Sequence, residues 1–395
     1  MTDRLYYSDA YLRTFSAAVT GCAPADDRFA VTLEVTAFYP TSGGQPHDVG
    51  VLGGRTVVNV VDRDDGPPVH LLDGPLDVGA RVQGDIDWTR RFDHMQQHTG
   101  QHVLSAAFDR VCQARTESFH LGTASATIDL HRQVTPAEIA AAEAEANRVV
   151  WEDREVHVRF VTAAEAAALP LRKDSGRTGT LRLIEVTDFD LSACGGTHVG
   201  RTGGIGIIAV TGWEKFKGGT RVEFQCGGRA LARMREWREA LAATNRLLSV
   251  SPMELGPAIE RLQGENKALA RTARGFQEQL ATRVAAELVA TGERVNGRVV
   301  VVRAMDGWDA AGLKAIAAGV ATHPGAAAAM FSSTTPALVV IARAADAPTD
   351  ASAVLKALVA KFGGKGGGKP DLAQGGGLVG DTDDLVATAA SLLRH

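Results

Sequence analysis

Two short motifs in this sequence together offer a complete set of metal ligands. The first, QHTGQH, places His98 and His102 four residues apart. That separation is about one helical turn, so both imidazoles project from the same face of a helix. The second, CGGTH, places Cys194 and His198 at the same separation, across two glycines that favour a tight turn. Three imidazoles and a thiolate suit Zn²⁺ better than Mg²⁺ or Ca²⁺, so the sequence predicts one zinc site.

Each motif alone also has a simpler interpretation. A histidine pair at this spacing can merely share a helix face, and CGGTH can be a glycine turn around a buried thiol. Because glycine and polar residues flank both motifs, their combination indicates a metal site. The remaining cysteines, Cys22, Cys112 and Cys226, lie outside the motifs. We expect these three to be small buried residues rather than ligands.

The composition is typical of a globular protein. The chain has 395 residues, 45% apolar and 22% charged, and that length predicts about two to four domains. A formal net charge of −4 excludes a globally basic nucleic-acid binder, so any RNA contact must use local basic patches. Scattered cysteines, an N-terminus without an apolar targeting region and the absence of a membrane-length apolar run predict a cytoplasmic location.

Residues 1–90 are expected to form a small β-barrel. Apolar and polar residues alternate over residues 29–35, 55–61 and 81–86, and glycines interrupt these runs at short intervals. This region contains a polar loop with the sequence SGGQP. Its two glycines permit close approach to a ligand, while Thr41 and Gln45 offer a hydroxyl and an amide. From composition alone, an ordinary polar hairpin loop is the favoured interpretation.

Residues 91–228 are expected to form an α/β domain that carries both ligand motifs. Apolar spacing predicts a helix over residues 98–111, and alternation predicts a strand over residues 124–130. A second helix should begin after Thr135, because Pro136 and Glu138 complete a helix-start signal. Further strands are expected at residues 155–161, 181–186, 206–210 and 221–225.

Residues 229–292 are expected to form an antiparallel helical hairpin. Apolar residues recur there at alternating steps of three and four, as in a coiled coil, on both sides of a Ser-Pro break. An ordinary amphipathic helix pair would give the same pattern. The hairpin could also mediate a homodimer.

Residues 293–395 are expected to return to an α/β fold, with buried strands near residues 299–302 and 337–341. A glycine-rich segment follows at residues 362–377, and its Lys365 and Lys369 suit contact with an RNA backbone. A flexible linker is the alternative interpretation, but the helix signal that follows favours an ordered loop. Overall, the fold class is α+β and multidomain.

The order of these motifs resembles a known family. Residues 38–50 (FYPTSGGQPHDVG), 97–102 (QHTGQH), 194–200 (CGGTHVG) and 220–227 (TRVEFQCG) are similar to the alanyl-tRNA editing proteins of the AlaX type and to the editing part of alanyl-tRNA synthetase. The resemblance covers roughly the first 228 residues. The glycine-rich C-terminal segment extends it, since it resembles the DHH-associated domain of long AlaX proteins.

This resemblance implies hydrolysis of the ester that joins serine, or secondarily glycine, to tRNA(Ala). Bound zinc would either lower the pKa of a water or hold the amino group of the substrate. To spare alanine, the pocket needs a polar partner for the serine hydroxyl. The family places a hydroxyl residue in the SGGQP loop, so Thr41 is the first candidate and Gln101 the second. Arg172, Lys173 and Arg177 form a basic loop that could contact the acceptor stem or simply be solvated.

Two alternatives remain at this point. A threonyl-type module that edits Ser-tRNA(Thr) shares the HxxxH and Cys-x3-His metal set, although the SGGQP barrel and glycine-rich tail argue against it. A non-catalytic tRNA-binding protein with structural zinc is the other. Nothing in the sequence resembles an aminoacylation domain, which favours an editing protein that acts in trans. A homodimer could form through the helical hairpin or the C-terminal domain.

Overall fold

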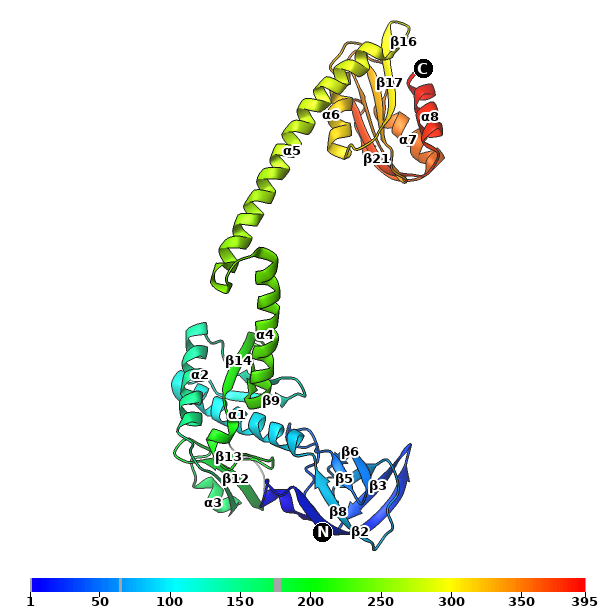
Figure 1. Cartoon of the computed structure of the whole chain (residues 1–395). Coiled ribbons are helices and arrows are strands. Elements are labelled where there is room, and N and C mark those ends of the chain that lie inside the picture. Colours follow the sequence, from blue (N-terminus) through cyan, green and yellow to red (C-terminus); the bar gives the residue numbers. More distant parts are fainter. Residues whose placement is uncertain (1, 64–65, 174–178, 395) are drawn as a thin grey trace. The chain divides into compact units, whose positions relative to one another are not determined.

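A computed structural model describes residues 2–63, 66–173 and 179–394 of the chain (Figure 1). The chain divides into two compact units, Met1–Thr244 and Asn245–His395, which are described separately below. Within the described residues, no helix combines the length and apolar character needed to cross a bilayer.

The N-terminal part of the first unit is a closed β-barrel, as predicted. Its strands follow the order β2-β3-β7-β6-β5-β8 and enclose an apolar core that includes Val31, Leu52 and Leu72. Strands β1 and β4 pair in parallel and form a separate two-stranded sheet. The strands are β1 (Asp3–Arg4), β2 (Thr14–Ala25), β3 (Arg28–Leu33), β4 (Val35–Thr36), β5 (Gly50–Leu52), β6 (Arg55–Val61), β7 (Val69–Leu72) and β8 (Arg81–Ile86).

Helix α1 (Trp88–Cys112) runs through the middle of the first unit and is buried along most of its length. It begins at Trp88 rather than at His98, so the sequence interpretation placed its start too late. The side chain of Asp87 accepts a hydrogen bond from the Arg90 amide and caps the helix. The first turns carry charged and polar residues, which hid the apolar periodicity on which the prediction relied.

Two sheets and α2 complete the first unit. The sheet β14-β15-β10-β9 packs with α1 and α2 in one apolar core, and the sheet β11-β12-β13 presents the Cys194 end of the ligand motif. Helix α2 (Pro136–Trp151) has the predicted capping box between Thr135 and Glu138. The remaining elements are β9 (Thr116–Leu121), β10 (Ala126–Leu130), β11 (Val156–Thr162), α3 (Ala163–Ala167), β12 (Thr180–Val186), β13 (Asp190–Ala193), β14 (Ile208–Phe216) and β15 (Gly219–Cys226).

The segment predicted as a helical hairpin does contain two helices, α4 (Gly227–Leu248) and α5 (Leu255–Thr291). A short 3-10 turn with its own capping box at Ser251 separates them. Several of the periodic apolar residues are exposed, among them Met234, Leu269 and Phe276. Packing of the two helices against each other, and a homodimer through them, therefore remain predictions.

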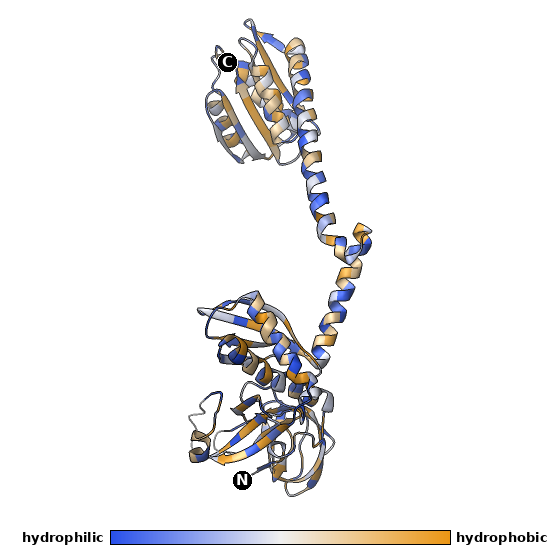
Figure 2. Cartoon of the chain, turned by 90° about the vertical axis from the view of Figure 1, so that its left-hand side faces the viewer, coloured by the Kyte–Doolittle hydropathy of each residue, from blue (hydrophilic) through white to orange (hydrophobic). Residues whose placement is uncertain are grey.

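The second unit ends in an α/β fold, as predicted. Its sheet has the order β16-β17-β18-β19-β21-β20, and the adjacent strands β17, β18 and β19 consist mainly of apolar residues, which are orange in Figure 2. Separate apolar cores join one face to α5 and α6 and the other face to α7 and α8. The elements are β16 (Glu293–Val295), β17 (Arg298–Met305), α6 (Ala310–Ala321), β18 (Ala327–Ser332), β19 (Ala337–Arg343), α7 (Ala351–Phe362), β20 (Lys365–Gly368), β21 (Leu372–Leu378) and α8 (Thr382–Arg394).

The glycine-rich segment of the second unit is an ordered β-hairpin. Strands β20 and β21 pair antiparallel, with Gly366 opposite Gly375. A Cβ atom at Gly366 or Gly368 would lie within 2.6 Å of atoms of β21, so glycine is what permits the two strands to lie so close. Lys365 and Lys369 are both exposed on this hairpin.

Candidate metal centre

The structure brings the four predicted ligands together. The candidate ligand atoms of His98, His102, Cys194 and His198 all lie within 4.8 Å of one another. The Cys194 Sγ lies 3.3 Å from His98 Nε2 and 3.4 Å from His198 Nε2. Ligands bound tetrahedrally at about 2.0–2.3 Å from Zn²⁺ would be separated by roughly 3.5 Å, so the cluster fits such an ion.

Gln45 fixes the orientation of His98. The backbone N–H of Thr197 donates to Gln45 Oε1 at 3.0 Å, which identifies that atom as the carbonyl oxygen. His98 Nδ1 lies 2.8 Å from the same oxygen and must therefore carry its proton. The lone pair of His98 is consequently on Nε2, the atom that faces the cluster. The SGGQP loop thus contributes a side chain that positions a candidate metal ligand.

Asp190 does the same for His102. Its Oδ2 lies 3.0 Å from His102 Nδ1, and its Oδ1 accepts a hydrogen bond from Arg172 Nε at 2.6 Å. Burial alone would raise the pKa of the Asp190 carboxyl, but His102 and Arg172 hold it at about 2. For His102, burial lowers the pKa, whereas Asp190 and Cys194 together raise it to about 9. An ionised carboxylate behind the imidazole makes its Nε2 a stronger metal ligand.

His198 and Cys194 complete the cluster. His198 Nδ1 lies 3.2 Å from Thr99 Oγ1, so all three imidazoles are held through Nδ1. Burial raises the pKa of the Cys194 thiol, but His98 and His198 outweigh that effect and lower it well below its usual value. The thiolate, which is the form that binds metal, is therefore favoured.

Glycines make room for this arrangement. A Cβ atom on Gly196 would lie 2.1 Å from His98 Cε1, and one on Gly100 would lie 2.3 Å from Cys226 Sγ. Gly100 of QHTGQH and Gly196 of CGGTH are therefore needed where helix α1 meets β15 and the second motif, whereas Gly195 has room for a side chain. Cys226 and Cys112 are buried and lie outside the candidate metal cluster, as predicted. Cys22 also lies outside the cluster, but it is only partly buried, so its predicted burial was wrong.

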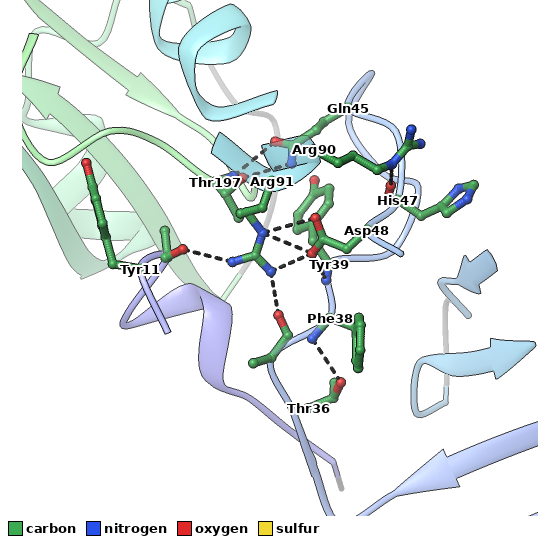
Figure 3. Close-up of polar contacts among 12 residues, drawn as sticks. Tyr11, Thr36, Phe38, Tyr39, Gln45, His47, Asp48, Arg90, Arg91 and Thr197 are labelled. Carbon is green, nitrogen blue, oxygen red and sulfur yellow. Dashed lines mark hydrogen bonds and ion pairs between the residues drawn. The ribbon is translucent and has the colours of Figure 1, made fainter. Parts of the chain in front are cut away.

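A buried ion pair joins α1 to the loop that carries Gln45 (Figure 3). Arg91 and Asp48 have fully buried side chains, and Arg91 Nε donates to both Asp48 oxygens at 3.0 Å. Arg91 also donates to the carbonyl oxygens of Ala10 and Ala37, while Asp48 accepts from the Tyr39 amide. This network links three chain segments beside the metal cluster.

A cavity of about 670 Å³ opens beside the cluster. That volume is in the range of small-molecule sites and is lined by both charged and apolar side chains. Gln101 lies in its wall, and its Nε2 donates to Ser105 Oγ at 2.8 Å. Among the described residues, Gln101 Oε1 has no hydrogen-bond partner. Described residues that line the cavity include Tyr7, Gln101, His102, Phe119, Phe160, Arg172, Lys173, Arg182, Ser192 and Cys194.

The other predicted site residues lie in different places. Thr41 is exposed and outside the cavity lining, and its Oγ1 lies 3.0 Å from His47 Nδ1. Arg172 and Lys173 both line the cavity, but Arg172 is engaged with Asp190. Arg177 lies outside the described residues. Lys365 and Lys369 belong to the second unit and are remote in sequence from the cluster.

We expect that Asp190→Asn weakens zinc binding about 10- to 100-fold, because loss of a carboxylate behind a metal-bound histidine has effects of that size. A chelator competition titration of the purified protein measures the dissociation constant directly. Asp188→Asn is the matched control, since Asp188 is close in sequence but exposed. Equal zinc affinities of the wild type and Asp190→Asn would contradict this role of Asp190.

Comparisons with known proteins identify the family of this chain. The model of the "Threonyl and Alanyl tRNA synthetase second additional domain" matches residues 181–223, and that of the "DHHA1 domain" matches residues 296–395. The alanyl-tRNA editing protein AlaX-L of Pyrococcus horikoshii is 31% identical over 95% of this chain and 94% of its own length.

Two further relatives cover smaller parts. An alanyl-tRNA editing protein of Mus musculus is 30% identical over 71% of this chain and 72% of its own length. The alanine–tRNA ligase of Pyrococcus abyssi is 33% identical over 74% of this chain, which corresponds to 33% of the ligase. Because the match to AlaX-L extends over nearly the whole of both proteins, this chain belongs to the alanyl-tRNA editing proteins of the AlaX type.

Proposed function

We propose that this editing enzyme is a deacylase that removes serine from wrongly charged tRNA(Ala) at a zinc centre. The observation that carries the proposal is the buried cluster of three histidines and one cysteine beside a cavity of about 670 Å³. Glycine on the same tRNA is the second candidate substrate. Bound zinc would supply a Lewis acid for the ester carbonyl, a more acidic water, or an anchor for the amino group.

Side chains around the cluster position its candidate ligands in the absence of substrate. Gln45 and Asp190 hold the Nε2 atoms of His98 and His102 toward the cluster, and the Cys194 thiol favours its thiolate form. This donor set is the reason to propose zinc rather than Mg²⁺, whose preferred ligands are carboxylate and water oxygens.

Gln101 is our candidate for recognition of the serine hydroxyl. It lines the cavity next to His102, and its Oε1 has no partner among the described residues. A hydroxyl group that donates to this oxygen would satisfy it, whereas the methyl group of alanine would leave it unpaired. Thr41 is less suitable, because its hydroxyl contacts His47 and it lies outside the cavity lining.

The tRNA contacts proposed from sequence have local support only. Lys173 is at the cavity, where its Nζ donates to the Glu117 carbonyl oxygen. Lys365 and Lys369 are exposed on the glycine hairpin of the DHHA1 region, where a phosphate backbone can reach them. We propose all three as RNA contacts. Arg172 would act there indirectly, by holding Asp190.

Deacylation of Ser-tRNA(Ala), with Ala-tRNA(Ala) and Ser-tRNA(Thr) assayed in parallel, tests this function. Of the three substrates, we expect only Ser-tRNA(Ala) to be hydrolysed rapidly. Gln101→Leu should remove serine roughly 10²-fold more slowly than the wild type, because a polar partner of the substrate is lost. Hydrolysis of Ser-tRNA(Thr) instead would favour the threonyl-type alternative. If zinc-loaded protein cleaves none of the three, a non-catalytic tRNA-binding role with structural zinc is favoured.

A further inference from the structure

Phe160 is an exposed aromatic residue at the cavity beside the metal centre. It lies on β11, the edge strand of the sheet β11-β12-β13, and its exposed fraction is 55%. A single exposed phenylalanine is common on protein surfaces, so its surroundings decide whether it has a role. Phe160 lines the same cavity as His102 and Cys194, which places it within the proposed substrate site.

The sheet aligns Phe160 with a metal ligand. Phe160 is directly opposite Arg182 on β12. The Cys194 amide in turn donates to the Arg182 carbonyl oxygen at 3.0 Å, which continues the register to the end of β13. Directly opposed residues of antiparallel strands project from the same face. Phe160, Arg182 and Cys194 therefore form one row, and with strands about 4.8 Å apart its ends are separated by roughly 10 Å.

The middle of this row is held in place. Arg182 Nε donates to the Tyr7 carbonyl oxygen at 3.0 Å, and its Nη1 donates to the carbonyl oxygens of Cys194 and Gly196 at 2.8 and 2.9 Å. Arg182 therefore fixes the strand geometry between the cluster and Phe160. At the end of the row opposite Cys194, the ring of Phe160 presents an exposed apolar surface. The exposed Lys173 adds a positive charge at the same cavity.

We propose that Phe160 is the stacking platform for the 3′-terminal adenine of the aminoacylated tRNA. This inference rests on the proposed function, because it places the aminoacyl group at the metal cluster. Every tRNA ends in adenosine, and the amino acid is esterified to the ribose of that nucleotide. An amino acid, a ribose and a purine in sequence have a length comparable to the row from Cys194 to Phe160. Stacking on an aromatic side chain requires no hydrogen-bond readout of the base.

Steady-state deacylation of Ser-tRNA(Ala) by Phe160→Ala, Phe160→Trp and Val158→Ala tests the proposal. Val158 is the matched control, because it is an exposed apolar residue two positions away on the same strand, outside the cavity lining. We expect Phe160→Ala to raise KM roughly 5- to 150-fold with little change in kcat. Phe160→Trp should keep KM close to the wild-type value, because tryptophan can also stack. Val158→Ala should have the KM and kcat of the wild type.

A second measurement separates stacking from a structural effect and from failure of the proposed function. The probe is 3′-(L-seryl)amino-3′-deoxyadenosine, a non-hydrolysable analogue, compared with serine ethyl ester, which lacks the nucleoside. Phe160→Ala should bind the adenosine analogue more weakly but hydrolyse the ethyl ester as the wild type does. Unchanged analogue affinity in Phe160→Ala, or equal losses with both compounds, overturns the proposal. A wild type that binds the analogue through Phe160 but deacylates no tRNA refutes the proposed function alone.

Discussion

Replacement of His102 by alanine is expected to lower kcat/KM for Ser-tRNA(Ala) by at least roughly 10³-fold. A catalytic metal ion contributes several kcal/mol of transition-state stabilisation, and each 1.4 kcal/mol corresponds to about a factor of ten. His102 is one of the four cluster side chains and also the contact between the cluster and Asp190. The variant should therefore contain less zinc, while its circular dichroism spectrum remains close to that of the wild type.

His157→Ala is the control for this experiment. His157 lies on β11, carries a half-exposed side chain paired with Glu155, and is outside the cluster. It should retain wild-type zinc content and activity. The metal content of the His102→Ala preparation must be measured. Wild-type activity in that preparation would contradict the proposal that the cluster is catalytic.

Replacement of Arg91 by methionine is expected to lower the free energy of unfolding by about 3–5 kcal/mol, because it leaves the buried Asp48 carboxylate without its partner. Both side chains are fully buried. The carbonyl oxygens of Ala10 and Ala37 also lose a donor. A denaturant titration monitored by intrinsic fluorescence measures this loss in the unfolding transition of the first unit.

Arg90→Met serves as the matched control. Arg90 is adjacent on α1 and only partly buried, and it donates one hydrogen bond to the His47 carbonyl oxygen. Its loss should cost roughly 1 kcal/mol or less. The double variant Arg91→Met with Asp48→Leu should recover part of the stability, because it removes both buried charges. A loss no larger for Arg91→Met than for Arg90→Met would show that the ion pair contributes little.

The grouping of the four candidate ligands could be predicted from sequence because its information is local. Each motif fixes the spacing of two ligands, and glycine occurs in both motifs where a side chain would collide. The residues that position those ligands carry no such signal. Asp190 reaches His102 across 88 positions, and Gln45 reaches Thr197 across 152. Only the folded chain brings these pairs into contact, so sequence could place Gln45 in a polar loop but could not identify its partner.

The fold was predictable where side-chain patterns are strong. The capping box of α2 and the alternation in β6 and β8 led to the observed elements. Strand β2 was missed because Gly21 and Pro24 interrupt its pattern. Strand β20 consists of one lysine and three glycines, so backbone pairing defines it and no alternation reveals it. The heptad spacing of α4 and α5 identified helices, but the spacing does not specify what covers their apolar residues.

The origin of the ligands on distant parts of the chain has a consequence for folding. His98 and Cys194 are 96 positions apart, so an ion held between them closes a loop that contains most of the editing region. A covalent link across about 100 residues removes conformational entropy from the unfolded chain equivalent to about 4.7 kcal/mol. The ion would act as a comparable cross-link that a chelator can open. Supply of metal would then govern how long the protein survives proteolysis, as well as whether it can edit.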